Sequence, residues 1–385
     1  MELKFEYKRT WRILFAALTG VGLIGIFYGL LTQPDRTWAN ILLNNYLFIM
    51  LSIGALFFYA VQYVTHSGWS AMFQRIPLAA GIWLPIGALL MLLLYFGMHS
   101  IYEWTHTEAV AYDKLLQHKS PYLNVPFFYL RATIYFIFWI GLAWWMRKLT
   151  MREDAEGTLH VDKHVRASGA FIFAIVFTFT MASIDWIMSI DAHWYSTLFG
   201  LKNLLATIYY AVAFMILLML WLQKQGYFTQ MNEAHRNDFA RYLFRLSIVW
   251  GYLWFVQFLV IWYANIPEAT MYYFPRVQGE WSTLFYLDFA LNFAIPFLVL
   301  MNDRVARTKI VMIMISLLLL AGMWISLFLQ IMPGSIGTLQ FGIIEVLTTV
   351  GFLGLYLYFV FSHLSKTPMV PLNHPYLEES KHRHL

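Results

Sequence analysis

The sequence contains no cysteine and few charged residues, and both absences limit what the protein can be. Without cysteine, the chain can hold no iron–sulfur cluster, no covalently attached c-type haem and no disulfide of its own. Only 12% of its 385 residues are charged, whereas 60% are hydrophobic and 19% are aromatic. A soluble domain carries about 25% charged residues. The composition therefore excludes a soluble protein and indicates one embedded in a membrane.

Long apolar runs recur along the whole chain, each close to the roughly 20 residues that span about 30 Å of hydrocarbon. We predict an all-α integral membrane protein with ten transmembrane helices. It forms a single polytopic domain over residues 1–385, with polar tails at 1–10 and 366–385. The expected spans are 11–31, 41–64, 77–99, 126–149, 167–189, 199–222, 240–264, 282–301, 308–331 and 338–363.

The basic residues predict the orientation of these spans. Lys and Arg number 26 against 21 Asp and Glu. They gather in the N-terminal segment, in alternate short loops and in the C-terminal tail. By the positive-inside rule both termini are expected on the cytoplasmic side. Since these residues sit in loops between apolar runs, we expect no nucleic-acid partner. No small-residue cleavage site follows the first apolar run, which predicts an uncleaved helix.

The stretch Met181–Gly200, MASIDWIMSIDAHWYSTLFG, carries Asp185 into a span and leaves it through Asp191, His193 and Trp194. An acid at the bilayer centre costs on the order of 2.5–3.5 kcal/mol, and less toward the interface. Such a residue therefore requires a structural or functional reason.

Asp288 and Glu345 are two further acids inside spans, each expected about two turns from the outer end of its helix. Each acid lies in a row of small or polar residues at helical spacing. A functional interpretation is a proton path, or a site for a polar head group, in the outer half of the membrane. A structural interpretation is that each acid is paired and holds two helices together. The proton-path candidates are Asp185, Asp288, Glu345, Thr178, Asn292 and Thr349.

Two basic residues are candidate structural partners for these acids. Lys202 enters the sixth span at the depth where Asp185 leaves the fifth, so we expect the two to approach each other. Arg131 lies at a similar depth on the fourth span. A pair at 4 Å is worth about 4 kcal/mol at an effective dielectric near 20, before desolvation is subtracted.

The histidines favour neither haem nor metal binding. His66, His99 and His363 fall at the ends of spans, whereas bis-histidine haem ligation needs two imidazoles at matched depth. We expect no metal site and no cofactor bound by this chain, with quinone left open. In the inner half, the segment Arg147–Arg166 is expected to be a solvated connector. The outer loops 100–125 and 265–281 are rich in aromatic residues, which fits an interfacial belt or a partner contact.

Two motifs carry a resemblance to a known family. The runs DWIMSIDAHWYST (185–197) and WYANIPE (262–268) resemble the F-type membrane subunit of bacterial alternative complex III, a quinol:electron-acceptor oxidoreductase. The resemblance implies a polysulfide-reductase-like (NrfD-like) fold: two four-helix bundles, helices 2–5 and 6–9, flanked by helices 1 and 10. Met181–Gly200 would join the bundles.

The resemblance also implies partners and a location. The partners would be a C-type NrfD-like membrane subunit and outer-side multihaem and iron–sulfur subunits, which carry the haem and the clusters, with lipid around the helices. The location would be the bacterial inner (cytoplasmic) membrane. Quinol oxidation is assigned in the family to the C-type subunit, whose site residues do not match this chain. A non-catalytic subunit that supports assembly is therefore expected, and proton conduction by it is a family proposal.

Two alternatives remain. The chain could bind quinone and catalyse in its own right, with a pocket formed by Trp186, Asp191, His193 and Trp194. It could instead be a freestanding secondary transporter. Such proteins show a pair of Gly/Pro-interrupted spans at matching positions in their two halves, and the sequence has no clear pair of this kind.

Overall fold

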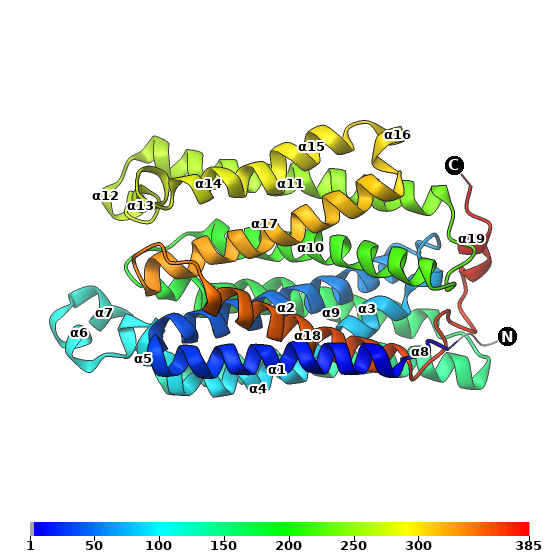
Figure 1. The fold of residues 1–385 in the computed structure, drawn as a ribbon, viewed down its shortest axis with the longest axis horizontal. Coiled ribbons are helices and arrows are strands. Elements are labelled where there is room, and N and C mark those ends of the chain that lie inside the picture. Colours follow the sequence, from blue (N-terminus) through cyan, green and yellow to red (C-terminus); the bar gives the residue numbers. More distant parts are fainter. Residues whose placement is uncertain (1–3, 385) are drawn as a thin grey trace.

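The computed structural model describes residues 4–384, and in it ten helical segments long and apolar enough to cross a membrane lie side by side (Figure 1). No strand occurs among residues 4–384, so the predicted all-α, ten-span membrane protein is confirmed. The spans are α1 (Arg9–Thr32), α2 (Pro34–Val64), a broken third segment (Ala71–Ile101), α8 (Val125–Glu156), α9 (Val161–Trp186), α10 (Thr197–Lys224), α11 (Glu233–Ala264), a broken eighth segment (Ser282–Leu300), α17 (Lys309–Ser335) and α18 (Ile343–Leu364).

The two broken spans and the loops are built from short helices. The third span comprises η1 (Ala71–Phe73), α3 (Arg75–Ala80), α4 (Trp83–Leu93), η2 (Leu94–Gly97) and α5 (Met98–Ile101). The eighth comprises α14 (Ser282–Phe289), the π-helical η5 (Ala290–Ala294) and α15 (Ile295–Leu300). The others are η3 (Glu103–Thr105), α6 (Thr107–Tyr112), α7 (Lys114–Lys119), η4 (Met188–Ile190), α12 (Pro267–Thr270), α13 (Phe274–Gln278), α16 (Asp303–Ala306) and α19 (Leu377–Lys381).

The spans pack as two four-helix bundles. In the first, α2, the third span, α8 and α9 pack in a ring. In the second, α10, α11, the eighth span and α17 do the same. Helices α2 and α10 pack against each other between the bundles, and most of their residues are buried. Helix α1 lies along α18, and this pair rests on α2 (Figure 1). The arrangement implied by the resemblance is thus the observed one.

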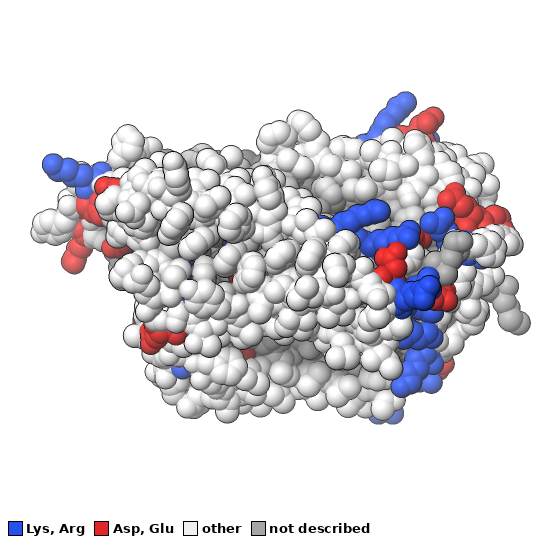
Figure 2. Space-filling view, turned by 90° about the horizontal axis from the view of Figure 1, so that it is seen from above, with Lys and Arg blue, Asp and Glu red and all other residues white. Residues whose placement is uncertain are grey.

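Charged residues are distributed unevenly along the long axis of the molecule. We call the end that holds the tails, residues 4–8 and 365–384, the tail end, and the end that holds the connector 187–196 the connector end. On the face seen in Figure 2, Lys and Arg gather toward the tail end, and a nearly uncharged band lies between the two ends. Ile24 and Phe27 on α1 are 68% and 67% exposed within this band. Exposed apolar surface of this kind matches hydrocarbon rather than water.

Several helices continue past their apolar runs at the tail end. Helix α8 runs on to Glu156 and ends at Gly157, which adopts the left-handed conformation with φ 68°. Helix α9 begins as early as Val161, so the turn between them is short. The prediction that Arg147–Arg166 is a solvated connector is therefore wrong. Glu153 and His164, which lie within it, are buried.

Helix α18 begins later than predicted, at Ile343 rather than residue 338. The preceding segment turns at Gly337, whose φ is 82°, a conformation that favours glycine. Glu345 consequently lies in the first turn of the helix and not two turns inside it.

Helices α1 and α18 touch through their backbones. A Cβ atom added at Gly22 would lie 2.1 Å from the Cα of Gly351. Small residues at such crossings let transmembrane helices approach closely and gain van der Waals contact.

This contact yields a first prediction. Gly22→Leu should lower the stability of the detergent-solubilised protein by about 1–3 kcal/mol, because the added side chain forces α1 away from α18. Gly20→Leu is the matched control on the same helix, since a Cβ at Gly20 meets nothing within 4 Å. Thermal unfolding compares the two, and equal midpoints would contradict the close packing.

Candidate functional site

Asp185 forms an ion pair inside the first bundle. Its carboxylate accepts hydrogen bonds from the Nε and Nη2 of Arg131 on α8, at 2.8 and 3.1 Å. The hydroxyls of Tyr122 and Tyr135 donate to the same carboxylate, each at 2.8 Å. Asp185 is 1% exposed. Four donors saturate a buried carboxylate, so this group joins α8 to α9 and has no free acceptor position toward a path.

Lys202 does not take part in this pair, and the predicted approach of Asp185 and Lys202 is wrong. Lys202 forms no ion pair with any carboxylate of residues 4–384. The reason is rotational: Asp185 points into the first bundle, whereas Lys202 on α10 points into the second. Arg131, the other predicted candidate, is the actual partner.

Glu345 is also held by a cation. Its carboxylate pairs with the guanidinium of Arg36 on α2, whose Nε donates at 2.7 Å, and with the amide of Asn40 at 2.9 Å. The backbone N–H of Gly342 donates to it at 2.7 Å, as in a capping box. Glu345 therefore caps α18 and joins it to α2.

Asp288 differs from the other two acids, because no cation of residues 4–384 pairs with it. It is 4% exposed and accepts a hydrogen bond from Asn292 at 2.9 Å. Lys202 and Ser326 face it from α10 and α17. A buried acid near a buried amine, without direct contact, is the arrangement in which a proton or a water molecule can move between groups.

The backbone is specialised at this point. Asp288 lies in the last turn of α14, two residues before the π-helical turn η5, which contains Asn292. Pro296 has no N–H, so the carbonyl of Asn292 lacks its usual helical donor four residues on. The hydroxyl of Tyr209 on α10 donates to that carbonyl instead, at 3.2 Å. Single π turns of this kind are frequent at functional sites.

The opposing helix leaves room for the Asn292 side chain. A Cβ atom added at Gly322 on α17 would lie 2.5 Å from the Asn292 Oδ1. This oxygen is buried and has no hydrogen-bond partner in the described part of the chain. The cluster of Asp288, Asn292, Lys202 and Ser326 is the candidate functional site, and we call it the Asp288 site.

A row of buried polar side chains leads from the Asp288 site toward the first bundle. Asn203 on α10 donates to Gln330 on α17 at 2.9 Å, and Gln330 contacts Ser326 at 3.5 Å. On the other side Asn203 faces Tyr46 of α2, whose hydroxyl bonds Ser183 of α9 at 2.7 Å. The sequence analysis missed this row. Two features of the sequence could have indicated it: Asn203 directly follows Lys202, and Ser326 and Gln330 are spaced four residues apart on one helix.

The two predicted threonines lie in other contacts. Thr178 accepts a hydrogen bond from the indole of Trp139 at 2.8 Å. Thr349 accepts one from Trp324 at 2.9 Å. Each hydroxyl thus satisfies a tryptophan on a neighbouring helix.

The four residues of the alternative quinone pocket fall into three groups. Asp191 and Trp194 share one of them, because the guanidinium of Arg276, the partner of Asp191, lies 3.5 Å from the centre of the Tyr272 ring on which Trp194 stacks. Trp186 is fully buried among aromatic rings of the first bundle, including Trp139. Asp191 pairs with Arg276 at 3.1 Å, and Trp194 stacks on Tyr272 with ring centroids 3.9 Å apart.

His193 pairs with Asp113 in the loop 100–125 at the connector end. This hydrogen bond holds the pKa of Asp113 below its usual range. The connector therefore joins the loops 100–125 and 265–281, and its polar groups make these contacts.

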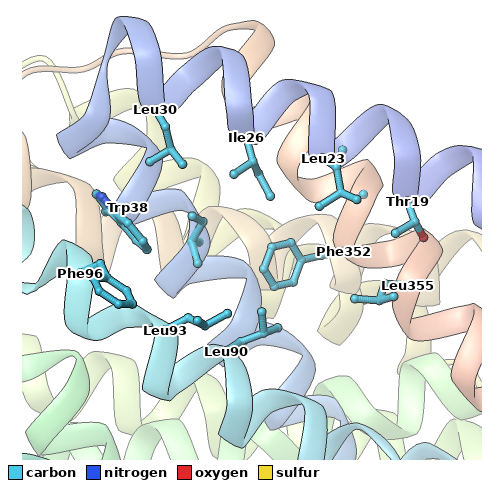
Figure 3. Close-up of a pocket in the computed structure, with 13 residues that line it drawn as sticks. Thr19, Leu23, Ile26, Leu30, Trp38, Leu90, Leu93, Phe96, Phe352 and Leu355 are labelled. Atoms are coloured by element: carbon cyan, nitrogen blue, oxygen red, sulfur yellow. The ribbon is translucent and has the colours of Figure 1, made fainter.

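An apolar groove opens between α1, α2, α4 and α18 (Figure 3). Its volume is about 270 Å³, and side chains such as Leu23, Ile26 and Phe352 point into it. The residues that line it include no ionisable side chain. The groove therefore offers contact to hydrocarbon but no group for acid–base chemistry.

Comparison of the sequence with models of known protein families and with curated proteins finds no match.

Proposed function

We propose that this chain is an integral, non-catalytic membrane subunit of a quinol:electron-acceptor oxidoreductase of the alternative complex III type. Two observations support the proposal. The runs 185–197 and 262–268 resemble the F-type subunit of that complex. The two bundles with their flanking helix pair agree with the fold that the resemblance implies.

The observation that carries most weight is that the two motif-bearing regions meet at the connector end. The indole of Trp194, from the first run, donates to the carbonyl of Ala269, directly after the second, at 3.1 Å. Close by, Tyr263 and Phe274 are 83% and 63% exposed. Exposed aromatic side chains of this kind are typical anchors of protein interfaces. We infer that the multihaem and iron–sulfur subunits dock here, with the C-type subunit and lipid alongside the helices.

The proposed orientation follows from charge. The tail end, where Lys and Arg gather, faces the cytoplasm of a bacterial inner membrane, and the connector end faces outward. Within this frame the Asp288 site is the proposed proton-conducting element. Asp185 and Glu345 hold helices together, because each is bonded to a guanidinium.

Affinity purification in mild detergent tests the proposal. The tagged chain is expected to carry haem-containing and iron–sulfur subunits with it, visible as the absorbance of reduced haem, although this chain lacks the cysteines for either cofactor. A chain that purifies alone and without haem would contradict the proposal and favour a freestanding transporter.

A pair of matched variants locates the contact. Replacing Tyr263 and Phe274 by alanine should lower the ratio of haem to tagged chain. Replacing Phe173 and Phe177 on α9, which are 69% and 57% exposed between the two ends, should leave it unchanged. Equal retention in both variants would place the partners elsewhere.

A further inference from the structure

The C-terminal tail crosses the tail end and joins both bundles. We call residues 367–384 the C-terminal strap. At the first bundle, the N–H groups of Leu372 and Asn373 donate to Asp154 Oδ1 at 2.9 and 3.3 Å. At the second, the carbonyl of Ser380 contacts the imidazole of His235 on α11 at 2.9 Å. The strap thus closes the tail end along its width.

A buried acid–base pair lies beneath the strap. Glu153 on α8 and His164 on α9 are 1% and 0% exposed, with 3.0 Å between Oε2 and Nε2. The hydroxyl of Tyr59 lies 3.2 Å from the His164 Nδ1, and the ring of Tyr63 stacks on the imidazole at 4.3 Å. The proposed function assigns this pair no role. Asn373 of the strap donates to the carbonyl of Glu153 at 3.1 Å.

His374 is the strap side chain that faces this pair. Its Nδ1 accepts the N–H of Tyr376 at 3.1 Å, so a neutral ring carries its proton on Nε2. That Nε2 lies 2.6 Å from the Gln74 amide nitrogen, a contact of two nitrogens. The Gln74 amide is therefore assigned the reverse orientation, with its oxygen toward His374 and its nitrogen toward the Tyr63 hydroxyl. Both ring nitrogens of His374 and the side-chain amide of Gln74 then have hydrogen-bond partners, but only while His374 is neutral.

A proton on Nδ1 would break this arrangement, because two donors would face each other at the Tyr376 N–H. The charged groups that face His374 do not compensate. Glu153 on α8 favours the imidazolium, whereas Arg75 on α3 and His164 on α9 oppose it. Asp154, which holds the strap backbone, is itself paired with Arg75.

We propose that the C-terminal strap is an acid-labile cover over the Glu153–His164 pair, held closed by neutral His374 and loosened when that imidazole takes up a proton. The device does not depend on the proposed function. Opening would give the aqueous solution at the tail end access to this buried pair, which the closed strap seals from it.

The pH range over which the strap should open follows from the lowered pKa of His374. Burial lowers the pKa of His374 from 6.5 to about 4, with smaller contributions from neighbouring charges. Because the closed form has the lower pKa, the strap is fully stabilised above pH 6.5, the pKa of the released side chain. Closure weakens about tenfold per pH unit as the pH falls from about 6.5 toward 4. Between pH 7.5 and 5.0 the ratio of closed to open strap should fall about 30-fold.

Hydrogen–deuterium exchange on the full-length protein tests the proposal. Exchange of the strap amides is measured at pH 7.5 and 5.0 and corrected for the intrinsic pH dependence of amide exchange, with α2 amides as an internal reference. In the wild type, protection of residues 372–380 should fall about 30-fold at pH 5.0. In His374→Gln, which keeps a donor and an acceptor but does not titrate, protection should be independent of pH.

A second variant keeps the test decisive if His374→Gln fails to fold. His374→Lys places a fixed charge at the same position, so the strap should be unprotected already at pH 7.5. Unchanged wild-type protection at pH 5.0 would overturn the proposal. So would an equal loss in wild type and His374→Gln, since the titrating group would then lie elsewhere.

Discussion

Arg131→Ala is expected to destabilise the protein by about 3–5 kcal/mol, the cost of leaving one partner of a buried ion pair without the other. Asp185 would remain inside the first bundle with only the hydroxyls of Tyr122 and Tyr135 to solvate it. A natural protein has a total stability of about 5–15 kcal/mol, so the loss should show as a sharp fall in folded protein recovered from the membrane.

Two further variants separate charge from packing. Replacing Arg131 and Asp185 together by leucine should restore much of the lost stability, because no unpaired charge is then buried. Arg241→Ala is the exposed control, since its pair with Asp303 lies in solvent and should contribute under about 1 kcal/mol. Unfolding midpoints in detergent give the comparison. An Arg131→Ala protein as stable as the wild type would contradict the structural role of the pair.

On the proposed function, Asp288→Asn is expected to leave the proposed complex assembled and able to oxidise quinol, while lowering the number of protons moved per electron. The amide keeps the shape of the side chain and can still accept the hydrogen bond from Asn292, but it cannot exchange a proton. Sealed vesicles that contain the purified complex allow proton movement and electron transfer to be recorded together.

The other two acids supply the controls for this experiment. Asp185→Asn and Glu345→Gln should reduce stability or assembly, because each weakens a bond to a guanidinium, and should leave the proton-to-electron ratio of the surviving complex unchanged. An unchanged ratio in Asp288→Asn, with intact complex, would rule out a proton path through the Asp288 site.

The spans could be predicted because apolar run length dominates the choice of membrane helices. Their polar contacts could not be, since sequence gives depth along a helix but not rotation about it. Asp185 and Lys202 lie at similar depth, yet they point into different bundles. Glu345 was expected deeper because the turn at Gly337, which delays the start of α18, does not interrupt the apolar pattern.

The buried pair Glu153–His164 escaped the sequence analysis for a different reason. Charged residues just beyond an apolar run are normally solvated, and here the C-terminal strap covers them from more than 200 residues further along the chain. In contrast, Asp288 and Asn292 could be selected as candidate residues from the sequence, because both interrupt an apolar run together with Pro296.

We propose that Asp288, alone among the three acids predicted to line a proton path, is free to exchange a proton, because no cation of residues 4–384 pairs with it. Infrared difference spectroscopy of the purified protein, recorded as the pH is changed, observes carboxyl groups directly. We expect a buried-carboxyl signal that changes with pH, disappears in Asp288→Asn and persists in Glu345→Gln. A signal that survives in Asp288→Asn, or that is lost in Glu345→Gln instead, would contradict it.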